Sequence, residues 1–100
     1  MRIGIFTQSI WSIPSIQKLT IHNQLKGVVV PEKEFQDLQI LFEVCANFKL
    51  ELFRWDRKDF EGITLWLSKM DFDRGLSFGF SYKIPNAIFE SFLFGVLNVH

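Results

Sequence analysis

The stretch LKGVVV, residues 25–30, decides the class of fold that this sequence predicts. It is an almost continuous apolar run, which is typical of a strand covered on both faces rather than of a strand with one face in water. A sheet that contains such a strand needs helices on both of its sides. The neighbouring segments should therefore alternate between helix and strand.

The segments on either side of residues 25–30 follow this alternation along the chain. Further runs that favour strands occur at 2–7, 49–55, 75–80 and 96–100. Segments with helical signals start at Ser12, Glu34, Asp59 and Pro85. This order predicts one domain over residues 1–100, an α/β fold of the Rossmann-like three-layer α/β/α type with a mostly parallel sheet of about five strands.

Two of the expected helices have recognisable sequence signals. Asp59 is placed to cap the third helix. The second helix carries an apolar stripe formed by Phe35, Leu38, Leu41, Phe42, Cys45 and Phe48. Cys45 is the only cysteine, which excludes an internal disulfide and a thiolate metal cluster. We interpret Cys45 as a buried core residue.

The composition favours a folded domain with more apolar residues than its core can hide. The 100 residues are 48% hydrophobic and include twelve phenylalanines, which is too apolar for a disordered segment. A domain of this size has a limited core, so we expect another chain segment or a second copy to cover part of the surface. A homodimer through exposed apolar surface is the corresponding hypothesis.

The charge pattern gives no signal for nucleic acid or for an anionic membrane. Eleven basic and eleven acidic residues balance, so no global field recruits a polyanion. The run FRWDRK at 53–58 is short and is interrupted by Asp56, and we interpret it as a strand end and its loop. With no signal-peptide core and no membrane-spanning apolar stretch in the sequence, the expected location is the cytoplasm.

Several site classes are excluded by the loops that follow the expected strands, where ligands of open parallel sheets bind. The loop TQSIWSIP after the first strand lacks the Gly-x-Gly-x-x-Gly pattern of nicotinamide enzymes. Glu32 follows the second strand, and we interpret it as a loop charge. Gln8 and Asp56 leave the acidic cluster of a phosphoacceptor domain incomplete. No phosphate-binding loop and no metal-ligand spacing occur.

Two features remain, and the expected topology places both at the same edge of the sheet. One is the strand exit GFSYKIP at 79–85, and the other is Asn-Val-His at 98–100. The order of these features resembles that of the folate-dependent formyltransferases: GFSYKIP is followed by a short helix, a glycine and an apolar strand that ends in Asn-x-His. The sequence resembles the N-terminal part of the catalytic domain of the methionyl-tRNA formyltransferase family. The strand and helix order agrees over the whole chain, and the specific motifs occupy 79–100.

The resemblance implies a reaction and two catalytic residues. The family transfers the formyl group of 10-formyltetrahydrofolate, the folate donor, to an amine acceptor. Asn98 matches the family's Asn, which holds the formyl oxygen as negative charge develops, a role suited to an uncharged amide donor. His100 matches the family's His, which assists proton transfer.

The resemblance also implies where the donor binds. In the family, the turn after the fourth strand lines the folate pocket. The matching residues are Ser81, Tyr82, Lys83, Ile84 and Pro85. The nearby Phe78, Phe80 and Phe92 are interpreted as core residues.

The chain also departs from the family pattern. Family members continue past the His into a Ser-Leu-Leu-Pro-like loop and supply a later Asp that pairs with it, and residues 1–100 contain neither. We therefore expect catalysis only in a longer form and an inactive 100-residue segment. The glycine-rich loop of the glycinamide ribonucleotide branch is also missing, so a transfer RNA or an amino-sugar nucleotide stays open as acceptor. The alternative is a non-catalytic α/β module for interaction or self-association.

Overall fold

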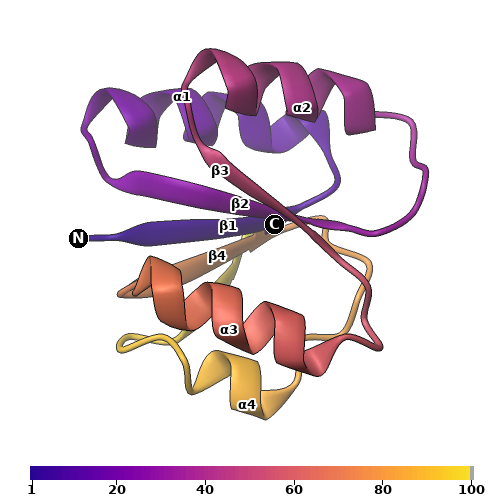
Figure 1. Ribbon diagram of the computed structural model, residues 1–100. Helices are drawn as coiled ribbons and strands as arrows, with labels where there is room; N and C mark the ends of the chain where they lie inside the picture. The colour runs from indigo at the N-terminus through magenta and orange to yellow at the C-terminus, as the bar shows by residue number, and fades with distance from the viewer. Residues whose placement is uncertain (100) are drawn as a thin grey trace.

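A single parallel sheet organises the chain in the computed structural model, which describes residues 1–99 (Figure 1). Its five strands have the order β3-β2-β1-β4-β5, and every neighbouring pair is parallel. They are β1 (Ile3–Thr7), β2 (Leu25–Pro31), β3 (Glu51–Trp55), β4 (Arg74–Phe78) and β5 (Val96–Val99). The predicted Rossmann-like parallel sheet is confirmed.

Helices cover both faces of this sheet. They are the 3₁₀ turn η1 (Ile10–Ser12) and the helices α1 (Ile13–Ile21), α2 (Leu38–Asn47), α3 (Phe60–Met70) and α4 (Asn86–Phe89). Helices α1 and α2 lie on one side of the sheet, and α3 and α4 lie on the other (Figure 1). The predicted three layers are confirmed, and no helix of residues 1–99 is both long and apolar enough to cross a membrane.

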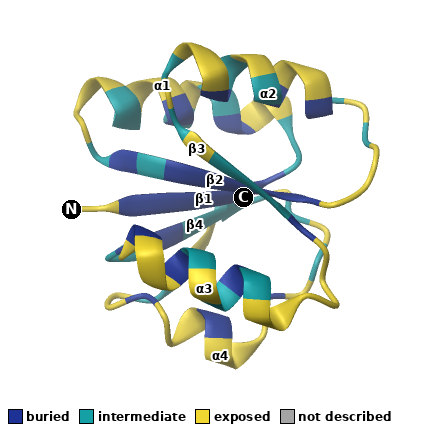
Figure 2. Ribbon diagram, in the orientation of Figure 1, coloured by how far each residue is buried: buried dark blue, intermediate teal, exposed yellow. Residues whose placement is uncertain are grey.

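The middle of the sheet is buried, as the sequence of β2 predicts. All five residues of β1 are buried, and in β2 only Lys26 is not fully buried (Figure 2). These strands lie between the two helix layers and receive side chains from both. The side strands β3 and β5 are more exposed.

Two separate clusters of side chains form the core, one on each face. The aliphatic cluster, toward α1 and α2, consists of Ile3, Ile5, Ile16, Leu25, Val28, Val30, Leu38, Leu41 and Cys45. The aromatic cluster, toward α3 and α4, consists of Phe6, Val29, Trp55, Ile63, Leu67, Met70, Phe72, Ile84, Ile88 and Phe92, with Phe53, Trp66, Phe80, Tyr82 and Val96 packed against it.

A row of glycines lets the aromatic rings lie close to the sheet. Gly27, Gly4 and Gly75 are register neighbours on β2, β1 and β4. A methyl group at Gly4 would lie 2.8 Å from the ring of Phe72, and one at Gly27 would lie 2.9 Å from the ring of Trp66. Real side chains do not approach so closely, so the rings occupy space that only glycine leaves open.

Some boundaries differ from the sequence prediction for local reasons. Helix α2 begins at Leu38 rather than at Glu34, because the Asp37 carboxylate accepts a hydrogen bond from the Ile10 N–H at 3.1 Å and ties this loop to η1. Strand β3 begins at Glu51 rather than at Lys49. Lys49 has a φ of 56°, which no strand residue adopts.

The C-terminal third shows the same kind of difference. Gly79 has a φ of 54° and ends β4 before Phe80. Helix α4 is only four residues long and does not reach Phe92, which packs into the aromatic cluster instead.

The predicted N-cap of α3 is confirmed, because the Asp59 carboxylate accepts a hydrogen bond from the Gly62 N–H at 2.9 Å.

Candidate functional site

A cavity of about 340 Å³ opens at the carboxyl ends of β4 and β5. It is lined by Ser77, Phe80, Tyr82, Lys83, Ile84, Asn86, Phe89, Val96 and Asn98. Four residues that the sequence analysis selected, Tyr82, Lys83, Ile84 and Asn98, therefore share one cavity. They come from two segments that are separated by α4 along the chain.

The remaining selected residues do not line this cavity. Ser81 is exposed, and its backbone N–H donates to the Gln8 side chain at 3.0 Å. Pro85 precedes α4 as its N-cap residue. His100 lies outside the described residues. The turn therefore enters the cavity through its middle residues, 82–84, and not along its whole length.

Asn98 is placed by the pairing of the last two strands. It is the register partner of Ser77 on β4, and both side chains belong to the cavity lining. Among residues 1–99, the Asn98 side-chain amide makes no hydrogen bond to the protein, and the residue is exposed. An amide in this position can donate its N–H groups to a ligand atom in the cavity.

A second cavity, of about 410 Å³, lies beside the first at the same edge. Its lining consists of Ser9, Trp11, Phe78, Gly79, Phe80, Asn98 and Val99. Phe80 and Asn98 belong to both linings and form the wall between the cavities. Trp11 was not expected at this site, because an exposed aromatic residue in a short turn carries no periodic signal in the sequence.

The interpretation of the three phenylalanines as core residues is only partly correct. Phe92 is buried in the aromatic cluster. Phe78 and Phe80 are only half-buried and line cavity surface. Phe78 packs against the aliphatic cluster and Phe80 against the aromatic cluster, and each also borders a cavity at the end of β4.

Phe80, which lines both cavities, packs against two other aromatic rings, those of Trp55 and Tyr82. Phe80 is stacked with Trp55 at a centroid distance of 5.9 Å, and Tyr82 meets both rings edge-on, at 5.5 Å from Phe80 and 5.7 Å from Trp55. Trp55 is almost completely buried, and its indole N–H has no hydrogen-bond partner among residues 1–99. This packing fixes the position of Tyr82 in the cavity wall.

Positive side chains surround the outer side of Tyr82. Lys33 Nζ lies 5.6 Å and the Arg57 guanidinium carbon 5.7 Å from the centre of its ring. Lys33 also donates to the Ser81 hydroxyl at 3.1 Å. Both basic residues follow strand ends, so they join the loops after β2 and β3 to the turn after β4.

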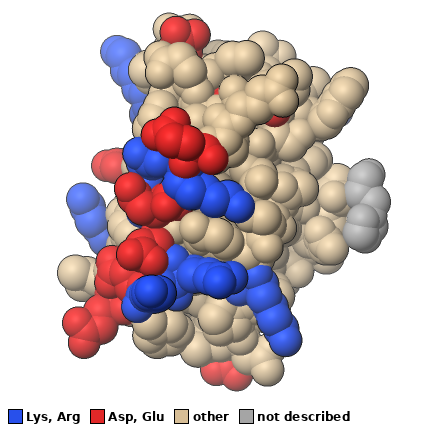
Figure 3. Space-filling model, turned by 90° about the vertical axis from the view of Figure 1, so that its right-hand side faces the viewer, with Lys and Arg blue, Asp and Glu red and all other residues tan. Residues whose placement is uncertain are grey.

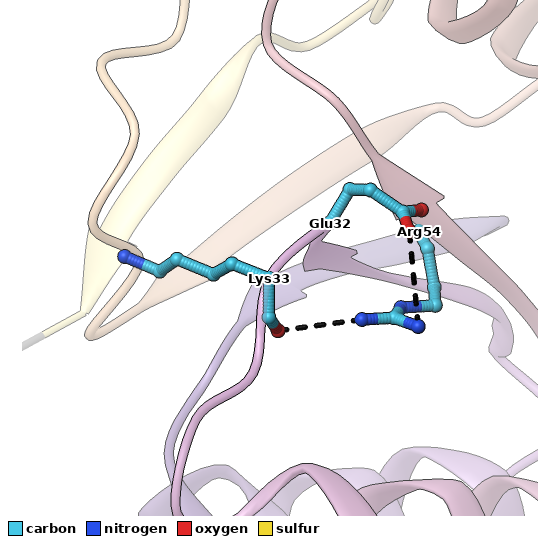
Figure 4. A network of polar contacts seen from close by, with 3 residues as sticks. All are labelled: Glu32, Lys33 and Arg54. Carbon is cyan, nitrogen blue, oxygen red and sulfur yellow. Dashed lines mark hydrogen bonds and ion pairs between the residues drawn. The ribbon is translucent and has the colours of Figure 1, made fainter.

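Glu32 lies in the loop after β2, next to Lys33, and is a loop charge, as expected from the sequence. Its carboxylate lies 3.8 Å from Arg54 Nη1, and Arg54 Nη2 donates to the backbone carbonyl of Lys33 at 3.3 Å (Figure 4). Both side chains of this ion pair are partly exposed, so its main effect is to orient the loop rather than to stabilise the fold.

Residues 1–99 contain no group of three or more His, Cys, Asp or Glu side chains that could hold a metal ion. Burial in the aliphatic cluster raises the pKa of the Cys45 thiol to about 11. A thiol that keeps its proton at neutral pH is a poor nucleophile. The interpretation of Cys45 as a buried core residue is confirmed.

The fold and the site define a Rossmann-like α/β protein with two adjoining cavities at the carboxyl ends of its strands. No known protein-family profile matches the chain, and no curated protein matches it either. The resemblance to formyltransferases therefore rests on the motif residues at 79–100.

Proposed function

We propose that the chain belongs to a formyltransferase that moves the formyl group of 10-formyltetrahydrofolate to an amine acceptor of the methionyl-tRNA or amino-sugar type. The observation that carries this proposal is the position of Asn98 in the wall between two cavities. A transfer reaction needs a donor and an acceptor to meet at one group. Asn98 is placed where ligands in both cavities can reach it.

The first cavity suits the donor. Its volume of about 340 Å³ falls within the range of small-molecule sites. Ile84, Phe89 and Val96 give it apolar walls, and Ser77 and Asn86 add hydrogen-bonding side chains. A flat heteroaromatic ring with polar edges, such as the pterin of a folate, needs this combination.

The second cavity suits the acceptor, because it reaches the same wall from the other side. The amine nitrogen forms a bond to the formyl carbon, and the formyl oxygen takes up the negative charge. The Asn98 amide donates a hydrogen bond to that oxygen. The bond from the formyl carbon to folate N10 then breaks, and a proton passes from the amine to N10. By the resemblance, His100 assists this proton transfer.

Binding of a stable 10-formylfolate analogue tests the donor site directly. We expect saturable binding by isothermal titration, with amide chemical-shift changes at Ser77, Tyr82 and Lys83. Asn98→Leu keeps the side-chain size and removes the amide, and we expect it to weaken binding about tenfold, as for the loss of one hydrogen bond. No binding at millimolar analogue, or shifts confined to residues away from both cavities, would contradict the proposal.

Asn47→Leu is the matched control. It makes the same chemical change at the last residue of α2, and Asn47 lines neither cavity. We expect its affinity for the analogue to equal that of the unchanged chain. Equal weakening by both substitutions would show that Asn98 acts through general stability and not through contact with the ligand.

A further inference from the structure

The turn that lines the candidate donor cavity, residues 79–84, is not held by regular backbone hydrogen bonds. Among residues 1–99, no backbone group of this turn bonds to another backbone group. The strand β4 before it is paired on both sides, and the Pro85 carbonyl after it accepts from the N–H groups of Ile88 and Phe89. The position of the turn between them therefore depends on contacts made by side chains.

Ser81 is the residue at which two other loops hold this turn. Its backbone N–H donates to Gln8 Oε1 at 3.0 Å, and its hydroxyl accepts from Lys33 Nζ at 3.1 Å. Gln8 directly follows β1, and Lys33 lies in the loop after β2. Ser81 itself lines neither the first nor the second cavity, so these two bonds fix the turn from outside the donor site.

The contact with Gln8 is the more specific of the two. The Lys33 side chain is exposed, and Figure 3 shows that charged side chains gather on one half of the face at the carboxyl ends of the strands. Water and neighbouring charges compete for such an ammonium group. Gln8 is half-buried, and because an N–H only donates, its side-chain oxygen is the atom that Ser81 requires.

The loop that carries Gln8 is itself firmly held. The hydroxyl of the buried Thr7 accepts from the Ser9 N–H at 3.1 Å, which bends the chain directly after β1. The Ser12 hydroxyl donates to the Ser9 carbonyl at 2.7 Å, and the Ser9 hydroxyl accepts from the Trp11 N–H at 3.1 Å. The Gln8 side chain therefore extends from a fixed loop to a turn that has no backbone bonds of its own.

We propose that Gln8 is a positioning residue of the donor site, which holds the Ser81 backbone so that Tyr82 and Lys83 line the first cavity. Gln8 lines neither cavity, so it acts through the turn and not by contact with the ligand. That the ligand beside this turn is the folate donor rests on the proposed function, whereas the effect of Gln8 on the turn does not.

Two substitutions at Gln8 separate the hydrogen bond from the size of the side chain. Gln8→Met keeps the length of the side chain and removes the accepting oxygen, whereas Gln8→Glu keeps an oxygen in the same place. In the chain without ligand, we expect Gln8→Met to speed hydrogen exchange of the Ser81 amide about threefold to tenfold, as for the loss of one hydrogen bond. It should also shift the amide signals of Tyr82 and Lys83, whereas Gln8→Glu should leave the exchange rate close to that of the unchanged chain.

Isothermal titration with the 10-formylfolate analogue then measures the effect on the site. We expect Gln8→Met to weaken binding about threefold to tenfold, and Gln8→Glu to recover most of the affinity. Gln39→Met is the matched control, because Gln39 also makes a side-chain hydrogen bond, to Glu43 on α2, and lines neither cavity. It should bind the analogue like the unchanged chain.

The possible results distinguish the role of Gln8 from the proposed function. An unchanged exchange rate at Ser81 in the Gln8→Met chain, or unchanged signals at Tyr82 and Lys83, overturns this role even if the analogue binds. Equal affinity of the Gln8→Met and unchanged chains also overturns it, as does equal weakening by Gln8→Glu. If the unchanged chain binds no analogue, the proposed function fails, and the exchange rate and signals of the unliganded chains alone decide whether Gln8 positions the turn.

Discussion

The aliphatic and aromatic clusters lie on opposite faces of the same sheet, yet only the aromatic cluster supplies side chains to the candidate donor cavity. The buried residues of the aliphatic cluster lie between the sheet and helices α1 and α2, and Phe78, which packs against them, borders the second cavity. In the aromatic cluster the rings of Phe72, Phe92, Phe6, Phe80 and Tyr82 form an unbroken series of contacts with centroid distances of 5.5–5.9 Å. The last two rings of this series line the candidate donor cavity.

We therefore expect the two clusters to differ in their effects: the aliphatic cluster should affect stability alone, whereas the aromatic cluster should affect both stability and ligand binding. Removing a buried side chain of the aliphatic cluster should lower the free energy of unfolding without changing the shape of the candidate donor cavity. Removing a ring from the aromatic series should do both, because well-packed rings transmit a displacement to their neighbours. Three substitutions or measurements test this division, in order of decreasing effect.

The largest effect is expected for Ile5 and Phe6, adjacent residues of β1 whose side chains point to opposite faces and are fully buried. Ile5→Ala should lower the free energy of unfolding by about 2–5 kcal/mol and Phe6→Ala by about 3–5 kcal/mol, because each leaves a cavity. Urea denaturation measures both. Only Phe6→Ala should also weaken binding of the folate analogue to the chains that remain folded, and equal binding by both variants would contradict the division.

A smaller effect on stability is expected at Phe80, because its ring is only half-buried. Phe80→Ala removes one of the two side chains, Phe80 and Asn98, that line both cavities, and it should join the cavities into one. The free energy of unfolding should fall by about 1–2 kcal/mol, while the affinity for the analogue should fall at least tenfold. Phe80→Leu is the control that keeps an apolar wall, and we expect it to recover most of the binding.

The smallest effect is expected from the thiol of Cys45 in the aliphatic cluster. Its pKa in the folded chain is raised to about 11 by burial, above that of a thiol in the unfolded chain. The folded chain therefore keeps this proton over a pH interval in which the unfolded chain loses it. The contribution of this group to the free energy of unfolding should be constant below the unfolded pKa and should fall as the pH rises toward 11.

The rate at which a thiol reagent modifies Cys45 measures how well the aliphatic cluster protects this thiol. At pH 8 the folded chain should react much more slowly than the chain in denaturant, and bound folate analogue should leave the slow rate unchanged except through its effect on unfolding. Rapid reaction of the folded chain would show that the aliphatic side of the sheet is open to solvent. The division between the two faces would then be wrong.

Much of the fold could be predicted because it is encoded locally. The apolar run of β2 indicates burial on both faces, and the Asp59 cap marks the start of α3. Helix and strand boundaries that depend on contacts between distant segments could not be predicted from the sequence. The start of α2 depends on the bond between Asp37 and Ile10, twenty-seven residues apart, which no local pattern contains.

The candidate site was predicted in part for the same reason. The turn at 82–84 and Asn98 were found as a motif, and the strand pairing of Ser77 with Asn98 brings them to one cavity. Trp11 was not found from the sequence, and Phe80 was expected in the core, against which it packs, but not in a cavity wall. The sequence around an aromatic residue does not show whether part of its ring is left open to a cavity. Only the arrangement of β4, β5 and η1 shows this.

The row Gly27, Gly4 and Gly75 across three neighbouring strands has a consequence for how this protein can evolve. Each of these positions has lost its side-chain volume to a neighbouring side chain: the Phe72 ring at Gly4, the Trp66 and Phe72 rings at Gly27, and Val96 followed by the Phe92 ring at Gly75. An alanine at one of these glycines is tolerated only if the neighbouring side chain moves or becomes smaller at the same time. Among diverged copies of this gene, the size of the residue at position 72 should therefore vary inversely with the size of the residue at position 4, so that substitutions at the two positions occur together.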